Sequence, residues 1–273
     1  MSHSNLSANS GLSHISSIND ANPIQSTTDD GILLRSLRAI YAISAYSISM
    51  AALVYFILFI SDLFIPITVN SGPFDMPVSQ AVLINLGLLL LFGVQHSVMA
   101  RAKFKTWFKQ YLHPSIERAT YCLATGLVIG FMCCSWAPMA GNVWTVESSV
   151  GVAILRVIGA LGWTITVIAT FNIDHFELFG LRQAYCQLVG KLMPNMSFKM
   201  SGLYKWIRHP IQTGILIGMW SVPVSTTSHL MMAIGMTIYV FVGLYFEEKD
   251  LIRQFGQTYR DYIQKVGKVL PRF

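Results

Sequence analysis

Charged side chains are scarce in this sequence. Of its 273 residues, 12% are charged and 53% are hydrophobic, and the mean hydropathy is +0.52. Soluble domains carry roughly 25% charged residues, so the composition excludes an ordinary soluble protein and predicts an integral membrane protein. Apolar runs with short connections fill the chain after residue 30, so we expect a single membrane domain over residues 31–273.

Lysine and arginine are absent from the first 30 residues, which are rich in Ser and Asn. A secretory signal needs a basic segment followed by an apolar core. We therefore interpret residues 1–30 as a disordered cytoplasmic tail. Cysteine is rare as well, and its spacing matches no metal motif, which predicts reduced thiols at Cys122, Cys133, Cys134 and Cys186.

Motifs of soluble nucleotide-binding proteins are also missing. The sequence contains neither GxGxxG after a strand nor GxxxxGK followed by Ser or Thr. The net charge of +6 does not predict a nucleic-acid partner, because the basic residues are spread over several connections. A zinc site needs three or four converging ligands. The wide separation of His96, His175 and His209 argues against one, so no metal is expected.

Six apolar runs predict the topology, and they cover residues 39–60, 78–99, 119–139, 151–171, 210–226 and 228–246. A bilayer core of about 30 Å needs about 20 helical residues, and the first four runs supply them. The last two share a tight connection with Pro223 as a breaker, so we expect one of them to be short, tilted or buried. The predicted fold is an all-α bundle that crosses the membrane about six times.

Basic residues set the expected orientation. All of the 19 Lys and Arg residues except Arg156 fall at the two ends of the chain or in connections 100–118 and 172–209. The opposite connections, 61–77 and 140–150, contain acidic residues but no basic ones. The positive-inside rule then predicts that the basic side and both termini are cytoplasmic. The inner membrane of a bacterium is the expected location.

Four polar clusters end apolar runs on the basic side, at residues 95–101, 171–183, 208–210 and 246–250. Ionisable groups at membrane depth are costly and usually face a cavity or a partner, so their convergence predicts a cavity. Structural interpretations exist for each. Arg101 would then mark only topology and His96 only helix packing, and Glu247 or Glu248 would form an ion pair with Arg208 or Lys205.

The C-terminal motifs resemble the isoprenylcysteine carboxyl methyltransferase superfamily. RHP opens a helix hairpin, and EE, FGxxYxxY and LP follow; these are Arg208, His209, Pro210, Glu247, Glu248, Phe255, Gly256, Tyr259, Tyr262, Leu270 and Pro271. Members are multi-pass membrane enzymes that bind S-adenosylmethionine at the cytoplasmic face of this hairpin. Two upstream segments, at 95–121 and 173–183, resemble the methanethiol S-methyltransferase branch, which makes dimethyl sulfide. Gln212 departs from the pattern, since the superfamily often has an aromatic residue there.

The resemblance implies an S-adenosylmethionine-dependent thiol methyltransferase whose cofactor-binding part covers about 201–273. The expected cofactor-binding residues are Tyr204, Arg208, His209, Pro210, Gln212, Glu247 and Glu248. Arg101, Arg182 and Gln183 are expected beside the substrate or behind the site. The expected partners are a small volatile thiol and the lipid bilayer.

Methyl transfer to a thiol also requires a base, because a simple thiol titrates above neutral pH. His175 is the predicted base, and Asp174 and His96 are the other candidates. An Asp–His pair next to each other in a sequence is only suggestive, since adjacent residues do not face each other on a helix.

Two other functions remain open at the level of sequence. The first is methylation of a prenylated cysteine or a lipid by an enzyme of the same superfamily; the segment 171–183 favours the small-thiol branch. The second is a non-catalytic membrane regulator of nitrogen-oxide metabolism, which need not keep both RHP and EE.

Overall fold

The computed structural model describes residues 30–194, 198 and 200–272. Among these residues, five helices are long and apolar enough to cross a membrane: α1 (Ile32–Ser61), α2 (Val78–Ala100), α4 (Pro114–Ser135), α5 (Ser149–Ile173) and α9 (Thr227–Phe255). The shorter elements are α3 (Ala102–Phe108), α6 (His175–Leu178), α7 (Leu181–Leu188), the 3-10 helix η1 (Gly202–Lys205), α8 (Pro210–Trp220), α10 (Gln257–Lys265), and the strands β1 (Asn142–Thr145) and β2 (Val224–Thr226). The predicted all-α, multi-pass membrane fold is confirmed. The predicted tail, residues 1–30, lies outside the described residues except for Asp30.

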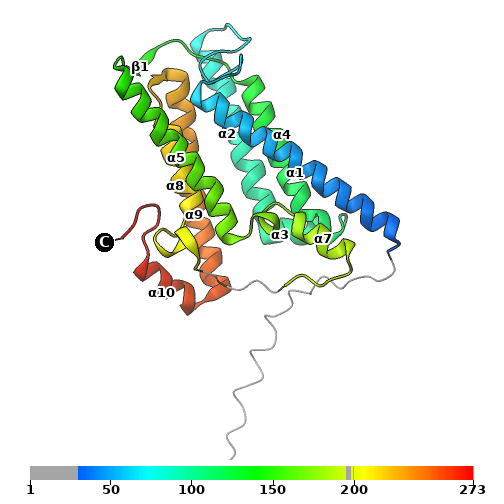
Figure 1. The fold of residues 1–273 in the computed structure, drawn as a ribbon. Coiled ribbons are helices and arrows are strands. Elements are labelled where there is room, and N and C mark those ends of the chain that lie inside the picture. The colour runs from blue at the N-terminus through cyan, green and yellow to red at the C-terminus, as the bar shows by residue number, and fades with distance from the viewer. Residues whose placement is uncertain (1–29, 195–197, 199, 273) are drawn as a thin grey trace, which may run out of the picture.

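The long helices form two groups that stand side by side (Figure 1). Helix α4 packs on α1 and α2 in one group, and α8 packs on α5 and α9 in the other. Helices α2 and α9 contact each other between the groups. The strands lie at one end of the bundle, and α3, α7 and α10 lie at the other, which we call the β end and the α10 end (Figure 1).

The fifth apolar run does not form a full helical crossing. Helix α8 has 11 residues, which at 1.5 Å per residue span about 16 Å, half of a bilayer core. Beyond Trp220 the chain is extended, and β2 pairs antiparallel with β1 at the β end. The short helix and the extended segment together lead from one end of the bundle to the other (Figure 1).

Hydrogen bonds pair the backbone N–H and C=O groups that this interrupted crossing leaves without helical partners, as a backbone at membrane depth requires. The N–H of Val146 donates to the carbonyl of Pro223 at 2.9 Å. At the end of α8, Nε2 of the buried His229 lies 3.1 Å from the carbonyl oxygen of Met219. This histidine therefore serves the helix end and is not a candidate for catalysis.

Glycines allow α8 to lie against α5. A Cβ atom at Gly162 would lie 2.6 Å from the backbone nitrogen of Gly218, closer than side-chain atoms approach a backbone. Such small residues let two helices pack at short range. The contact fixes the height at which α8 begins, and so the position of Arg208 and His209 just before it.

The largest apolar core lies towards the β end. It includes Phe59 of α1, Met132 of α4, Trp136 directly after α4, Met219 of α8 and Met232 of α9. The polar clusters predicted from sequence lie at the α10 end instead. The stable core and the candidate site are thus separated along the length of the bundle.

Candidate functional site

Helix α8 begins at Pro210, as the sequence predicts, because proline at the first helical position loses no hydrogen bond. The two residues before it pair with the C-terminal segment. The N–H of Arg208 donates to the carbonyl of Gly267 at 2.9 Å, and that of His209 to the carbonyl of Lys268 at 3.1 Å. The C-terminal segment is therefore fixed to the residues that precede the first turn of α8.

Glu248 of α9 gathers the basic side chains of this region. Its Oε1 accepts a hydrogen bond from Nε of Arg208 at 2.8 Å and lies 3.2 Å from Nε2 of His209. Its Oε2 lies 2.7 Å from Nζ of Lys268. We call these four residues the Glu248 cluster. The guanidinium of Arg208 also donates to two carbonyls at the end of α10, so Arg208 clamps α8, α9 and α10 together.

Glu247, the preceding residue, keeps an open carboxylate. Its side chain is 49% exposed, whereas that of His209 is 4% exposed. Its ion-pair partner among the described residues is Nδ1 of His209, at 3.9 Å. Burial, and next the charge of Glu247, raise the pKa of the Tyr204 phenol. A carboxyl group is thus open to a ligand at the edge of the Glu248 cluster.

Tyr259 of α10 was not selected as a binding residue from sequence, although the FGxxYxxY motif contains it. Its side chain is 2% exposed, and within the described part of the chain its hydroxyl has no hydrogen-bond partner. The charges of Glu248 and Arg208 act on it. Buried hydroxyls without a partner are rare, so this one can pair with a ligand. Only the structure shows that the hydroxyl is unpaired.

Gly256 brings Tyr259 to this position. Its φ of 58° and ψ of −127° end α9 and start α10. This conformation is open to glycine and strained for other residues. The turn folds α10 back beside the last turns of α9.

His96, on α2, lies among polar and aromatic side chains of α2, α4 and α9. The hydroxyl of Tyr121 lies 2.9 Å from its Nε2 and 3.0 Å from its Nδ1, and Oγ1 of Thr125 lies 3.2 Å from its Nδ1. Its ring stacks on Phe92 at a centroid distance of 5.4 Å and meets Tyr239 edge-on at 6.1 Å. This candidate base therefore has a hydroxyl neighbour at each ring nitrogen.

His175, the favoured base, is 7% exposed at the start of α6. Its Nε2 lies 2.9 Å from the hydroxyl of Tyr46 on α1, and its Nδ1 lies 2.8 Å from Oγ1 of Thr170 on α5. Its ring stacks on Phe171 at 4.3 Å. Burial lowers the pKa of the imidazole, and the charge of Asp174 partly opposes this. The contacts of His175 join α1 to the end of α5.

The remaining candidates around His175 stabilise the turn between α5 and α7. Oδ1 of Asp174 accepts from the N–H of Glu177 at 3.0 Å and so caps α6. Its Oδ2 lies 2.5 Å from Nη1 of Arg182. Nε2 of Gln183 donates to the carbonyl of Glu177 at 3.1 Å. Within the described residues, no hydrogen bond or ion pair connects Asp174, Arg182 or Gln183 to the Glu248 cluster.

Arg101 lies at the end of α2 and pairs with Asp250 of α9 at 3.1 Å. Its guanidinium also lies 4.7 Å from the ring centroid of Phe246. It therefore ties α2 to α9. Gln212 is half-buried on the first turn of α8. No group of three metal-ligating side chains, the three histidines considered above included, is found in the described ranges.

Most of the predicted residues thus fall into two groups, and His96 and Arg101 of the α2 segment lie outside both. Arg208, His209 and Glu248 meet in one cluster, with Glu247 at its edge. His175 and Asp174 lie in a separate set of contacts with α1, α5 and α7.

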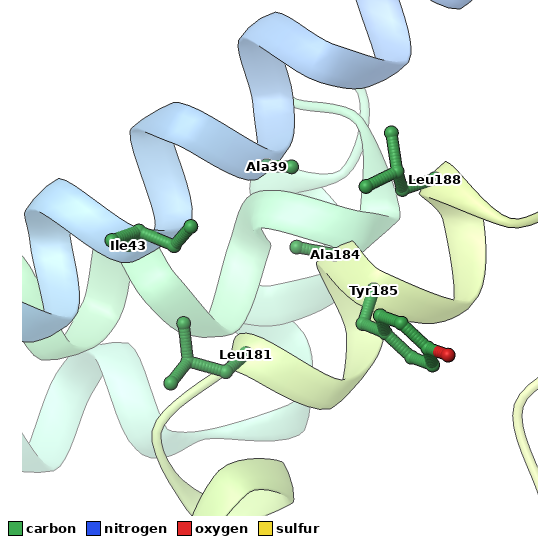
Figure 2. A pocket seen from close by; sticks show the side chains of 6 residues that line it. All are labelled: Ala39, Ile43, Leu181, Ala184, Tyr185 and Leu188. Atoms are coloured by element: carbon green, nitrogen blue, oxygen red, sulfur yellow. The ribbon is translucent and has the colours of Figure 1, made fainter.

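An apolar groove lies between α1 and α7, with a volume of about 220 Å³ (Figure 2). It is lined by Ala39, Ile43, Leu181, Ala184, Tyr185 and Leu188. The hydroxyl of Tyr185 points away from α1 (Figure 2). The groove offers apolar surface but no acid, base or charge for methyl transfer.

Comparison with known proteins finds relatives that match nearly the whole chain. It is 42% identical over 237 residues to the methanethiol S-methyltransferase of Mycobacterium tuberculosis, covering 87% of this chain and 97% of the relative. It is 44% identical over 207 residues to the methanethiol S-methyltransferase of Pseudomonas deceptionensis, covering 76% and 79%. Nurim of Xenopus laevis is 32% identical over 186 residues, covering 64% of each. No family model and no solved structure matches the chain.

Proposed function

This chain belongs to the methanethiol S-methyltransferase family, and we propose that it transfers the methyl group of S-adenosylmethionine to methanethiol and releases dimethyl sulfide at the cytoplasmic face of the membrane. The relatives support a membrane methyltransferase. The observation that carries the cofactor assignment is the open carboxylate of Glu247 beside the closed Glu248 cluster.

The side chains present fit this cofactor. S-adenosylmethionine supplies an electrophilic methyl group on a sulfonium, and it also carries an ammonium, a carboxylate and ribose hydroxyls. Glu247 has free capacity for the ammonium. The unpaired hydroxyl of Tyr259 can donate to an oxygen, and Lys268, whose side chain is 37% exposed, can face the carboxylate.

For Arg208 we propose a structural role in place of the cofactor contact expected from the sequence. Its N–H groups are directed at Glu248 and at carbonyls of the α10 segment, and its side chain is 7% exposed. Removing its partner would leave a buried charge unpaired, which is strongly destabilising. We infer that Arg208 holds the binding residues in place, while His209 stays beside Glu247 at the edge of the site.

The chain's own contribution to the chemistry is to exclude water and to accept the proton of the thiol. A thiolate that attacks a sulfonium neutralises charge, so a dry site favours the step by not solvating the separated ions. Methanethiol is small and apolar and can enter through the lipid. Neither step requires a residue of the apolar groove between α1 and α7.

A sealed-vial assay tests this function. Membranes that carry the protein receive S-adenosylmethionine and methanethiol, and dimethyl sulfide is measured in the headspace. We expect product with the intact protein and a loss of S-adenosylmethionine binding of at least tenfold in Glu247→Ala. Asp261→Asn, which removes an exposed carboxylate on α10, is the control and should bind normally.

Each other result has a defined meaning. Cofactor binding without dimethyl sulfide would move the acceptor to a prenylated cysteine or a lipid. The absence of both binding and product would support the non-catalytic regulator. Normal binding in Glu247→Ala would refute the role of this carboxylate.

A further inference from the structure

Five side chains place polar atoms together where α2, α4 and α9 approach one another near the α10 end. We call them the His96 chamber: Gln95, His96, Tyr121, Thr125 and Tyr239. Polar and ionisable groups within membrane helices are costly and usually mark a substrate path or a proton relay. The Glu248 cluster does not include any of these residues, so they need an explanation of their own.

One hydrogen-bond acceptor in the chamber, on Gln95, has no donor within the described residues. Nε2 of Gln95 lies 3.1 Å from Sδ of Met99 and 3.4 Å from Oγ1 of Thr125. Its Oε1 is buried and has no partner among the described residues. A buried acceptor without a donor costs about 1–3 kcal/mol. A thiol S–H is a weak donor of the right kind. It can donate to Oε1 as the thiol enters, before it turns to the oxygen of Tyr121 for proton transfer.

The chamber is linked to the edge of the cofactor site along one face of α9. Tyr239, Gly243 and Glu247 follow one another at intervals of four residues, which places them on the same face. A Cβ atom built at Gly243 would meet nothing within 4 Å, so the helix surface is open at this position, one turn from each of the two side chains. Glu247 also lies within electrostatic reach of Tyr121 and Tyr239.

We propose that the thiol binds in the His96 chamber and that Tyr121 passes its proton to His96. This rests on the proposed function and assigns its acceptor site. The S–H bond breaks and its proton goes to the oxygen of Tyr121 as the hydroxyl proton of Tyr121 moves to Nε2 of His96. The electron pair left on sulfur forms the bond to the methyl carbon. The pair of the carbon–sulfur bond that breaks stays on the donor's sulfur, and the positive charge lost there is regained on the imidazole.

The walls of the chamber also predict selectivity for small thiols. The ring of His96 lies between Phe92 on one side and Tyr239 on another, with centroid distances of 5.4 and 6.1 Å. The ring of Tyr239 further contacts that of Phe92 at 5.2 Å. Because these rings contact one another, little space is left beside His96, and we expect a long prenyl chain to be excluded.

The test uses a pair of matched variants in the full-length protein. Tyr121→Phe removes the hydroxyl beside His96, and Tyr46→Phe removes the hydroxyl beside His175, each at 2.9 Å from Nε2. We expect Tyr121→Phe to lower kcat for methanethiol about 100-fold, as for loss of a proton-transfer group. Binding of radiolabelled S-adenosylmethionine should stay within twofold, and Tyr46→Phe should keep kcat within twofold of the intact protein.

A second readout separates proton transfer from a structural effect. 2,2,2-Trifluoroethanethiol is more acidic than methanethiol and is ionised to a greater extent at the same pH, so it needs less help from a base. The defect of Tyr121→Phe should shrink to less than tenfold with this thiol. A variant that only loosened the fold would lose the same factor with both thiols.

Three results would overturn the proposal: equal defects with the two thiols, loss of cofactor binding in Tyr121→Phe, or an equal fall of kcat in Tyr46→Phe. If Tyr121→Phe does not accumulate, Gln95→Met replaces it. That variant should raise KM for methanethiol about tenfold with KM for S-adenosylmethionine unchanged, and an unchanged thiol KM would refute the chamber. Failure of the proposed function itself would appear earlier, as no dimethyl sulfide from the intact protein.

Discussion

The two tyrosine–histidine pairs of this bundle share one short contact but differ in ring geometry and in surroundings. In each pair a tyrosine hydroxyl lies 2.9 Å from Nε2 of a histidine, and a threonine hydroxyl lies close to Nδ1. The Tyr46 ring meets that of His175 edge-on, whereas the hydroxyl of Tyr121 lies 3.0 Å from Nδ1 of His96 as well, and the two rings are tilted by 40°. Both pairs lie towards the α10 end. A further difference lies in what is left over once these contacts are made.

In the His175 pair every polar group is used. Oγ1 of Thr170 donates to the carbonyl of Val167 at 2.7 Å, so it must accept from Nδ1–H of His175. The remaining lone pair, on Nε2, then faces the hydroxyl of Tyr46. The ring is also stacked on Phe171. A histidine fixed in this way stabilises a helix contact.

In the His96 pair an acceptor and an open space remain. The unpaired Oε1 of Gln95 adjoins it, and the surface of α9 is open at Gly243, one turn before Glu247. The comparison teaches that the distance between a tyrosine and a histidine does not identify a base. The proposal for His96 rests instead on the unpaired groups beyond the pair.

The largest expected effect comes from replacing His96 itself. His96→Asn should lower kcat for methanethiol about 10³-fold, because general-base catalysis typically contributes 10²–10⁴-fold. Asparagine keeps a polar side chain of moderate size at the site. Headspace dimethyl sulfide, measured beside S-adenosylmethionine binding on the same sample, checks this. A fall of less than tenfold with normal binding would remove His96 as the base.

The second effect concerns the threonines. Thr170→Val leaves Nδ1–H of the buried His175 without an acceptor, so the free energy of unfolding should fall by about 1–3 kcal/mol. Thr125→Val is the matched change in the other pair and should instead lower kcat about tenfold, by releasing the His96 ring. Thermal unfolding in detergent and turnover per folded molecule are the two measurements. An exchange of these outcomes between the variants would reverse the assignment of the pairs.

The third effect fills the space that distinguishes the His96 side. Gly243→Ala should stabilise α9 by up to about 1 kcal/mol, since alanine favours helix over glycine and its Cβ meets nothing. If the space belongs to the ligands, KM for methanethiol should rise several-fold at the same time. Gly87→Ala is the control, because Gly87 is an exposed glycine of α2 whose added Cβ also meets nothing. It should stabilise without a change in KM.

The fold was largely predictable from the sequence, because burial in lipid requires long apolar runs that hydropathy detects. The first four apolar runs form the long helices α1, α2, α4 and α5. Pro223 marks the interrupted crossing. Hydropathy does not reveal which groups form hydrogen bonds with the backbone where such a crossing is interrupted. His229 reaches back to the carbonyl of Met219, and only the folded chain shows which carbonyl is left open.

The candidate site was predictable in part. The motifs brought Arg208, His209 and Glu248 together as expected, and the structural ion pair considered from sequence is present between Arg208 and Glu248. The choice of the base stays a prediction. Asp174 drew attention to His175 because it is adjacent in sequence, whereas the contacts that occupy His175 come from Tyr46, 129 residues away. Local sequence carries no record of such partners.

The smallest expected effect is on the pH dependence of stability, and it sharpens the structural role of His175. Burial lowers the pKa of His175 in the folded protein below its ordinary value near 6.5. Above that value neither state is protonated and the packing contributes in full. As the pH falls below about 6.5 the unfolded chain takes up a proton first, so stability decreases, by at most about 1.4 kcal/mol per pH unit.

The melting temperature in detergent should therefore fall between pH 7 and pH 5 more steeply in the intact protein than in His175→Asn, which has no proton to gain at this position. His113, whose pKa burial also lowers, is present in both proteins and cancels in the difference. Equal slopes would mean that His175 is protonated as readily in the folded chain as in the unfolded one. A structural role for His175, with its ring stacked and hydrogen-bonded at both nitrogens, would then explain this residue less well than the role of base predicted from the sequence.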